Sequence, residues 1–462
     1  MHRVVGLLGL VAALGATGPA QALQAAPAAP VGARDEAPPP RVTTPPRGLA
    51  PTVTAAEKDL LPGAQLLPFD AIVRHARESA MRVRVGRSRL ELGDAAVAGA
   101  KPLMVDNPQL YIGAGLRFND AGKHFELQST FNQPFEFGGE RGLRIKAGKR
   151  YREYLDKELV QLQWETYAQV HYSYNMALLA RARASTAERT QGFSARLLEV
   201  AERRAQAGEI SKLRVRVAAG ELAQARQNKL NADLEYRLAC IHLSEVAGWP
   251  PPQLVAPAGN LEAPLRVRSE ADLIARVQAE HPAIKAREAA VDLGAARVTS
   301  AHRDRLPEPQ LGVYAGREFE PGATTGASKI ALVMFTLPLP LWKRNQAPRA
   351  QTRAELSVAE QELEATRYTL ALSARRAVDS VNTAAERVRT YSVEVVPRFE
   401  ENLNLLQRAF ELGEVDIIEV FVARENFLRI QNEALDAYRA YYDAVYALES
   451  ILGSPIQSVA VG

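Results

Sequence analysis

An internal repeat constrains this chain more than any other feature of its sequence. The stretches AGEISKLRV (207–215) and LGEVDIIEV (412–420) each interrupt a long helical pattern, and their glycines, Gly208 and Gly413, lie 205 positions apart (413 − 208). Identities at this offset include Val215/Val420, Ala218/Ala423, Leu230/Leu435, Tyr236/Tyr441, Leu243/Leu448, Gly248/Gly453 and Pro250/Pro455. Chance does not keep such a register, so the chain contains a duplicated unit.

The N-terminus has the parts of a secretory signal peptide. A basic start precedes an apolar stretch over 4–16, and the small residues AQA (20–22) form a cleavage site. We therefore expect a signal peptide over 1–22, with a retained N-terminal anchor as the alternative. The Pro/Ala-rich leader that follows, over 23–68, predicts little ordered structure. The single cysteine, Cys240, allows no internal disulfide.

Composition and motifs argue against nucleic-acid binding and against catalysis. The formal charge is only +4 over 462 residues, without a long basic run. The histidines are scattered without metal-ligand spacing, and no HExxH, CxxC or complete phosphate-binding motif is present. We therefore expect no enzyme activity, no cofactor, no resident metal site and no nucleic-acid partner.

The two halves show the same order of predicted elements, which sets the domain limits. Repeat 1 is expected over 69–266 and repeat 2 over 267–462, each beginning with a helix (69–98 and 269–303). Two strands, a very long helix, a glycine break and a shorter helix follow in each repeat.

Four segments with alternating apolar residues are predicted to be strands. They cover 108–119, 123–135, 308–319 and 327–338. Their lengths suit a tilted crossing of a bilayer, whereas a half-buried hairpin on a soluble core is the alternative for either pair. Four strands cannot close a barrel, so membrane strands require several copies of the chain to share one.

Very long helices dominate the rest of the chain. No proline occurs between Phe135 and Trp249, and a helix over 139–206 is about 100 Å long at 1.5 Å per residue. Spacings of three and four residues predict a heptad seam in the second half, and Pro397 predicts a kink there. The seam is Leu356, Ala359, Leu363, Thr366, Leu370, Ser373 and Ala377.

The two glycine breaks are predicted to be reversals between antiparallel helices. Gly208 and Gly413 are each followed by a polar residue, Ser211 or Asp416, that can cap the next helix. Each break is then the tip of a helical hairpin. The strands lie at the opposite end of the long helices.

This order of elements resembles the TolC-like family of outer-membrane factors, also called outer membrane efflux proteins. Local motifs look closest to the CzcC-like heavy-metal efflux branch, and the resemblance runs from about residue 69 to the end of the chain. The motifs are NQPFEFGGERGLRIKAG (132–148), HPAIKARE (281–288), VVPRFEENLNLLQRAFELGEVDIIEV (395–420) and RAYYDAVYALESILGSP (439–455).

The resemblance implies a mainly α-helical fold with transmembrane β-strands. In a homotrimer, each protomer would add four strands to a shared 12-stranded β-barrel and its antiparallel coiled coils to an α-helical barrel. The protein would lie among the lipids of the outer membrane of a Gram-negative bacterium, with its helices in the periplasm. A periplasmic adaptor (membrane fusion) protein would link it to an inner-membrane RND-type pump, making it the passive exit duct of a tripartite efflux system.

The tips are the candidate site for adaptor docking and gating. The residues assigned to it are Gly208, Glu209, Ser211, Gly413, Glu414, Asp416 and Glu419. Arg214 stands where the family's first tip usually carries an acid, so the second tip is the more acidic one and the better candidate for the gate. Acids at a constriction favour cations. Solvated turn residues without a function are the alternative.

Two other classes of protein share parts of this pattern. A periplasmic adaptor is exported and rich in coiled coil, but it should show one helical hairpin, whereas this chain shows two hairpins and two strand pairs. A structural coiled-coil protein has no need for strands long enough to cross a bilayer. The cargo, heavy-metal cations, is predicted from the branch resemblance alone.

Overall fold

The computed structural model describes residues 61–119, 122–267, 270–306, 308–318 and 328–461, all within one compact unit. The expected signal peptide, most of the leader and most of both predicted strand turns lie outside these residues.

The last part of the expected leader is ordered. The strand β1 (Gln65–Leu67) pairs in parallel with β4 (Val255–Pro257), and Leu61 is buried in the same apolar cluster as Ile72. The expectation of an unstructured leader is therefore wrong for 61–68. A three-residue strand that pairs with a distant part of the chain leaves no periodic signal in a proline-rich stretch.

The first helix of each repeat is broken once, so two helices stand where one was expected. They are α2 (Phe69–Ser79) and α3 (Met81–Ala100) in repeat 1, and α6 (Glu270–Glu280) and α7 (Pro282–Arg303) in repeat 2. The backbone is extended between them, at Ala80 (ψ 132°) and His281 (ψ 127°). The apolar periodicity runs across both breaks and therefore hides them.

A glycine from a distant helix end fits against each break. A Cβ on Gly248 would lie 2.3 Å from the carbonyl oxygen of Ser79, and one on Gly453 would lie 2.5 Å from Pro282 Cδ. Both glycines also have positive φ, 82° and 66°. The repeat identity Gly248/Gly453 thus has a packing reason in both halves.

Four strands form one antiparallel sheet in the order β2-β3-β6-β7. They are β2 (Gln109–Asn119), β3 (Gly122–Pro134), β6 (Gln310–Glu318) and β7 (Ser328–Thr336), close to the expected segments. The register places large, exposed apolar side chains from all four strands on one face. They are Leu110, Ile112, Leu116, Phe125, Leu127, Phe131, Leu311, Val313, Val333 and Phe335.

Two helical hairpins make up most of the remaining chain. The first is α4 (Glu140–Gln206) and α5 (Lys212–Ala247); the second is α8 (Gln346–Arg389), α9 (Val396–Leu412) and α10 (Ile417–Leu452). The 67 residues of α4 form a helix about 100 Å long, as the proline-free stretch predicts. All seven residues of the predicted seam in α8 are at least partly buried, and Leu356 packs closely against Gly294 of α7.

The predicted kink is a π-helical turn. The segment η1 (Thr390–Val395) joins α8 to α9, and the Val396 N–H donates to the Tyr391 carbonyl, five residues back. Pro397 follows in the first turn of α9. Because proline lacks an N–H and its ring crowds the preceding turn, the helix widens before it.

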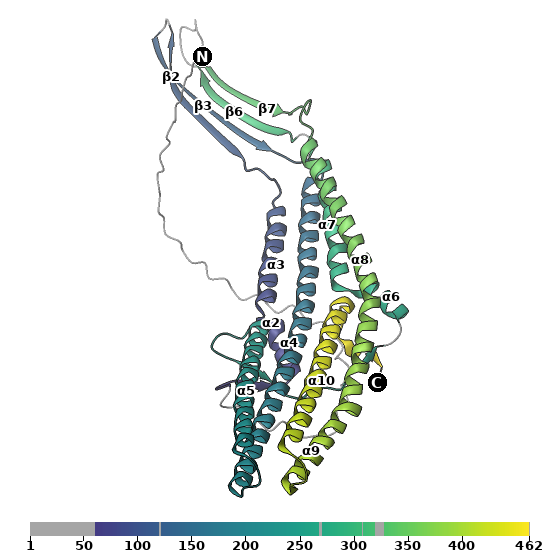
Figure 1. Ribbon diagram of the computed structural model, residues 1–462. Helices are drawn as coiled ribbons and strands as arrows, with labels where there is room; N and C mark the ends of the chain where they lie inside the picture. The colour runs from purple at the N-terminus through teal and green to yellow at the C-terminus, as the bar shows by residue number, and fades with distance from the viewer. Residues whose placement is uncertain (1–60, 120–121, 268–269, 307, 319–327, 462) are drawn as a thin grey trace, which may run out of the picture. The chain divides into compact units, whose positions relative to one another are not determined.

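The helices contact one another in two sequences (Figure 1). Near the sheet the order is α3, α4, α7 and α8, and toward the tips it is α5, α4, α10 and then α8 and α9. The short helix η2 (Ile456–Ser458) leads into β8 (Ala460–Val461). This strand pairs with β5 (Arg266–Val267) in a two-stranded antiparallel sheet. Elements of repeat 1 thus form one edge (β2, α3, α5), and elements of repeat 2 form the other (β7, α8, α9).

Within the described residues, every helix is too short or too polar to cross a bilayer.

Candidate functional site: the tips and the strand-to-helix junction

Both glycine breaks are helix ends of the same geometry. Gly208 and Gly413 have φ of 78° and 83°, a left-handed conformation that glycine adopts without a Cβ clash. In each, the glycine N–H and the next N–H donate to carbonyls three and five residues back, at 2.9–3.1 Å. This Schellman arrangement satisfies carbonyls at the helix end. The predicted reversals are therefore present in both hairpins.

The two predicted caps differ. Both Ser211 and Asp416 hold the N-cap position with an extended backbone. Asp416 Oδ1 accepts from the Ile418 N–H at 3.3 Å, whereas the Ser211 side chain makes no such bond. Capping by the side chain is confirmed for Asp416 only.

The two tips pack against each other. Phe410, Ile417 and Val420 of the second hairpin are buried in one apolar cluster with Leu197 and Ala201 of the first. Burial of this surface makes the tips of one chain a single packed unit. Moving one tip away from the other exposes this cluster.

Two arginines of the first hairpin bind the second tip. Arg204 Nε donates to Glu209 at 2.8 Å, its Nη1 donates to the Phe410 carbonyl at 3.1 Å, and its guanidinium lies 5.1 Å from the Phe410 ring centroid. Arg214 forms an ion pair with Asp416. The residue that departs from the family pattern thus binds an acid of the opposite tip.

A third arginine was not singled out from the sequence. Arg424 of α10 is 9% exposed, donates to Ser194 Oγ of α4 at 2.7 Å and forms an ion pair with Glu221 of α5. The repeat offset aligns Arg424 with Ala219 (424 − 205). An arginine at a position where the first repeat has an alanine is the sequence signal that points to this bridge.

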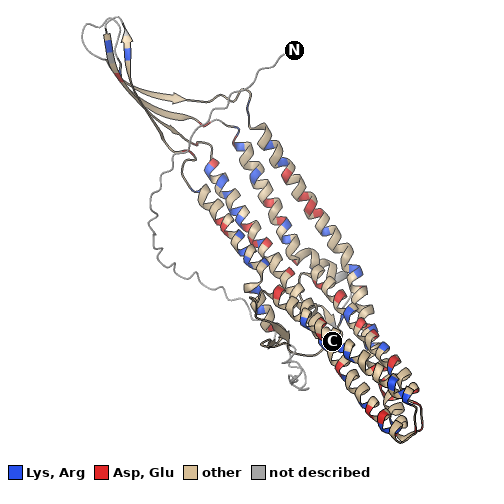
Figure 2. Cartoon of the chain, turned by 60° about the vertical axis from the view of Figure 1, so that its left-hand side comes forward, with Lys and Arg blue, Asp and Glu red and all other residues tan. Residues whose placement is uncertain are grey.

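The structure divides the charged residues of the predicted site into two groups. Glu209 and Asp416 are each bound by an arginine of the first hairpin. Glu414 and Glu419 are exposed. Figure 2 shows both signs of charge on the helices near the hairpin ends. The negative charge that the second tip presents to solvent therefore includes Glu414 and Glu419.

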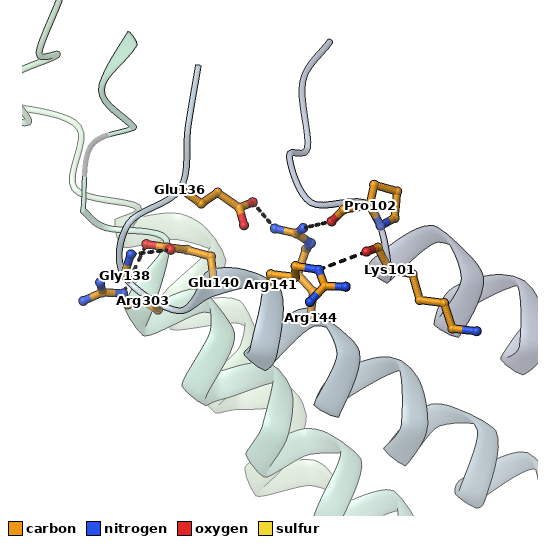
Figure 3. A network of polar contacts seen from close by, with 8 residues as sticks. All are labelled: Lys101, Pro102, Glu136, Gly138, Glu140, Arg141, Arg144 and Arg303. Carbon is orange, nitrogen blue, oxygen red and sulfur yellow. Dashed lines mark hydrogen bonds and ion pairs between the residues drawn. The ribbon is translucent and has the colours of Figure 1, made fainter. Parts of the chain in front are cut away.

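At the other end of α4, arginines join the segments that connect strands to helices (Figure 3). Arg144 forms an ion pair with Glu136, which follows β3, and donates to the Pro102 carbonyl, which follows α3, at 3.4 Å. Arg141 Nε donates to the Lys101 carbonyl at 2.9 Å. The end of α3, the end of β3 and the start of α4 are thereby held together.

A glycine at the centre of this junction leaves room for an arginine side chain. A Cβ on Gly138 would lie 1.2 Å from Arg303 Nη2, so a side chain there displaces the arginine. Arg303 comes from α7 and its Nε binds Glu140 at 3.2 Å, while the Gly138 N–H donates to the same carboxylate at 2.8 Å. The FEFGGERG motif therefore joins both repeats at the junction.

Two carboxyl groups beside this network have raised pKa values. Burial, followed by repulsion from Glu140, raises the pKa of Asp304, and burial, followed by repulsion from Asp106, raises the pKa of Glu308. The folded chain holds these protons more tightly than the unfolded one. Both groups therefore lower the stability of the fold as the pH rises through their pKa values.

Two histidines of the described helices, His281 and His171, form hydrogen bonds within the fold. His281 Nδ1 accepts from the Ala283 N–H at 3.1 Å and its Nε2 donates to the Ser450 carbonyl at 3.1 Å; burial lowers its pKa. His171 binds Glu449 at 2.8 Å. In the part of the chain that the structure describes, no group of three His, Cys, Asp or Glu side chains is placed to hold a metal ion.

The family model described as outer membrane efflux protein matches residues 92–249 and 273–454, one segment in each repeat. This chain belongs to that family. Among relatives of this outer membrane efflux protein, the cobalt-zinc-cadmium resistance protein CzcC of Cupriavidus metallidurans is 27% identical, over 84% of this chain and 90% of CzcC. The nickel-cobalt-cadmium resistance protein NccC of Alcaligenes xylosoxydans xylosoxydans is 24% identical, over 69% and 71% of the two chains.

A solved channel shares the fold of this outer membrane efflux protein. The CmeC outer membrane channel of Campylobacter jejuni superposes with a TM-score of 0.67 at 12% identity, covering 83% of this chain and 85% of CmeC. The family resemblance seen in the sequence, including the CzcC-like branch, is confirmed by these comparisons.

Proposed function

We propose that three copies of this chain form a passive exit duct through the outer membrane, as the outer component of a tripartite efflux system with an adaptor and an RND-type pump. Each copy adds four strands to a shared 12-stranded barrel, and its helical hairpins form a tunnel through the periplasm. The observation that carries this proposal is the four-stranded sheet, because it has one exposed apolar face and two open edges.

The open edges favour a ring of copies. An unpaired strand edge leaves backbone N–H and C=O groups without partners, which a bilayer does not tolerate. Pairing β2 of one copy with β7 of the next satisfies both edges. Such head-to-tail contacts close into a ring when the rotation is right, and the family resemblance supplies the number three.

The edge helices carry apolar side chains that suit the same contact. On α5, Leu234, Leu238 and Ile241 are exposed at heptad spacing; on α8, Tyr368 and Leu372 are exposed. Knobs-into-holes packing between neighbouring copies would cover both surfaces.

The tips are proposed as the periplasmic entrance and the docking site of the adaptor. Gly208, Ser211 and Gly413 shape the turns, and Glu209 and Asp416 are held by arginines that join the hairpins. Opening then requires the links between the hairpins, Arg204 to the Phe410 carbonyl and Arg214 to Asp416, to break. The exposed pair Glu414 and Glu419 lies where three copies would surround the entrance, and it favours cations there.

The proposed cargo is a heavy-metal cation. CzcC and NccC are named for resistance to cobalt, zinc, cadmium and nickel. The specificity of the system would lie in the pump, so metal resistance should require an intact system as well as this chain.

Cell fractionation and planar-bilayer conductance test the proposal together. We expect recovery from the outer membrane as a trimer and a cation-preferring conductance that loses part of its cation preference in E414Q/E419Q. The pair E360Q/E364Q on α8 is the matched control. Recovery as a soluble periplasmic monomer would favour the adaptor class and refute the duct. Unchanged cation preference in E414Q/E419Q would refute the role of the tip acids.

A further inference from the structure

The linker between β7 and α8 exposes a dense apolar segment. Residues 337–345 separate these elements, whereas only residues 135–139 separate β3 from α4 in the first repeat. Within the longer linker, Leu339 is 68% exposed and Trp342 is 84% exposed, the highest value among large apolar side chains in the described residues. Leu337 and Leu341 are exposed as well. The tunnel does not need this surplus of apolar residues to connect a strand to a helix.

This segment continues the apolar face of the sheet. The alternate residues Val333 and Phe335 of β7 belong to that face, and the leucines at 337, 339 and 341 keep the same alternation beyond the last paired residue, Thr336. Basic residues stand at both limits of the run. Lys329 pairs with Arg317 at the far end of the ladder, and Lys343 and Arg344 follow Trp342 at the helix end.

Part of the linker backbone is hydrogen-bonded within the linker and the first turn of α8. Pro338 and Pro340 have no N–H to satisfy. The Leu341 N–H donates to the Leu339 carbonyl at 2.9 Å, and Arg344 Nε donates to the Pro340 carbonyl at 3.1 Å. The Trp342 carbonyl accepts from Gln346 Nε2 at 2.7 Å. Each of these internal bonds lowers the cost of moving the loop out of water and into contact with lipid.

The end of the linker next to α8 is hydrogen-bonded to α7. Asn345 has a left-handed backbone (φ 56°), and its Nδ2 donates to the Ala301 carbonyl of α7 at 3.0 Å. The linker is therefore fixed to the junction that Arg303 and Glu140 complete. A fixed apolar loop beside the sheet can hold the chain at one depth in a bilayer.

We propose that residues 337–344 form a lipid-binding collar, which enters the boundary between headgroups and acyl chains on the helix side of the membrane. The leucines would contact acyl chains, the Trp342 ring would lie at the interface, and Lys343 and Arg344 would bind anionic headgroups. This collar sets the depth of the barrel. It rests on the proposed function, because it requires the apolar face of the sheet to lie in a membrane.

Quenching of tryptophan fluorescence by brominated phospholipids tests the collar. The purified protein is reconstituted into phosphatidylethanolamine/phosphatidylglycerol vesicles brominated near the headgroup end of the acyl chain. We expect wild-type fluorescence to be quenched, W342F to lose most of that quenching, and W249F, which removes a tryptophan stacked on His75, to keep it. Equal quenching in W342F and wild type would overturn the collar.

A second measurement separates lipid from a neighbouring copy as the occupant. The exposed Leu103 lies between α3 and β2 on the opposite edge of the chain, which a head-to-tail ring would bring toward the linker of the next copy. Efficient disulfide formation between L103C and W342C of different copies would overturn the collar in favour of that contact. A protein that conducts ions but shows no Trp342-dependent quenching refutes the collar alone. One that neither conducts nor enters vesicles refutes the proposed duct.

Discussion

At two equivalent glycines, backbone geometry and close packing explain the residue type. Gly453 has positive φ and lies against the His281–Pro282 break, while Gly248 repeats the arrangement against Ser79. His281, which stood out in the sequence as part of a family motif, is an N-cap whose neutral ring accepts one hydrogen bond and donates another.

Gly453→Ala should destabilise the fold by at least about 1–2 kcal/mol, because the alanine would adopt a left-handed backbone and its Cβ would clash with Pro282. The denaturation midpoint of the detergent-solubilised protein measures this. Gly192→Ala is the control: Gly192 lies inside α4 with open space around it, so alanine should stabilise the helix by up to about 1 kcal/mol. Equal midpoints for the two variants would contradict the packing argument.

Acidification should weaken the fold through His281. Burial lowers its pKa below the ordinary value of 6.5, so the unfolded chain binds the proton more readily. The contribution of neutral His281 to stability is present above pH 6.5 and is lost as the pH falls toward the lowered pKa. Denaturation midpoints between pH 7.5 and 5 should therefore fall more steeply for wild type than for H281N, whose amide oxygen keeps the cap. Parallel pH profiles would show that His281 does not titrate in this range.

At the scale of elements, the long periodic helices and the two glycine breaks were predictable from the sequence, whereas the breaks between α2 and α3 and between α6 and α7 were not. The seam residues of α8 are at least partly buried where their spacing predicts, and α4 has its predicted length. Pro397 signalled a kink, yet the chain forms a π-helical turn before it. The breaks at Ala80 and His281 were missed because apolar spacing continues across them.

The exposed stripe of α5 should hold neighbouring copies together. L234E/L238E places charge in a surface that the proposed ring buries, and we expect the trimer to dissociate while the far-ultraviolet circular dichroism stays helical. L234M/L238M keeps size and polarity and should remain trimeric. Chemical cross-linking and size-exclusion chromatography provide the measurement. A trimeric glutamate variant would place the contact elsewhere.

For the whole molecule, the decisive arrangement is the packing of two hairpin tips joined by arginines. Removing Arg204 and Arg214 eliminates one hydrogen bond and one ion pair between the hairpins. The loss of about 1–3 kcal/mol of closed-state stability should raise the open population roughly 5- to 150-fold.

Single-channel recording of R204A/R214A measures this shift as longer or larger openings. K212A is the matched control, because Lys212 is an exposed cation of the same turn. If R204A/R214A opens no more often than K212A, the arginines stabilise the tips without gating them.

The duplication, the order of strands and helices, the two tips and the family could be predicted from the sequence. Each of them depends on residue periodicity or on local turn chemistry. The tertiary structure decided what those elements contact. Arg214 forms an ion pair with Asp416, and Arg424 binds Ser194 of α4 and Glu221 of α5. Arg303 lies against Gly138, and residues 65–67 pair with 255–257 in a two-stranded sheet. These partners are far apart along the chain, and only packing of the two repeats brings them within reach of one another.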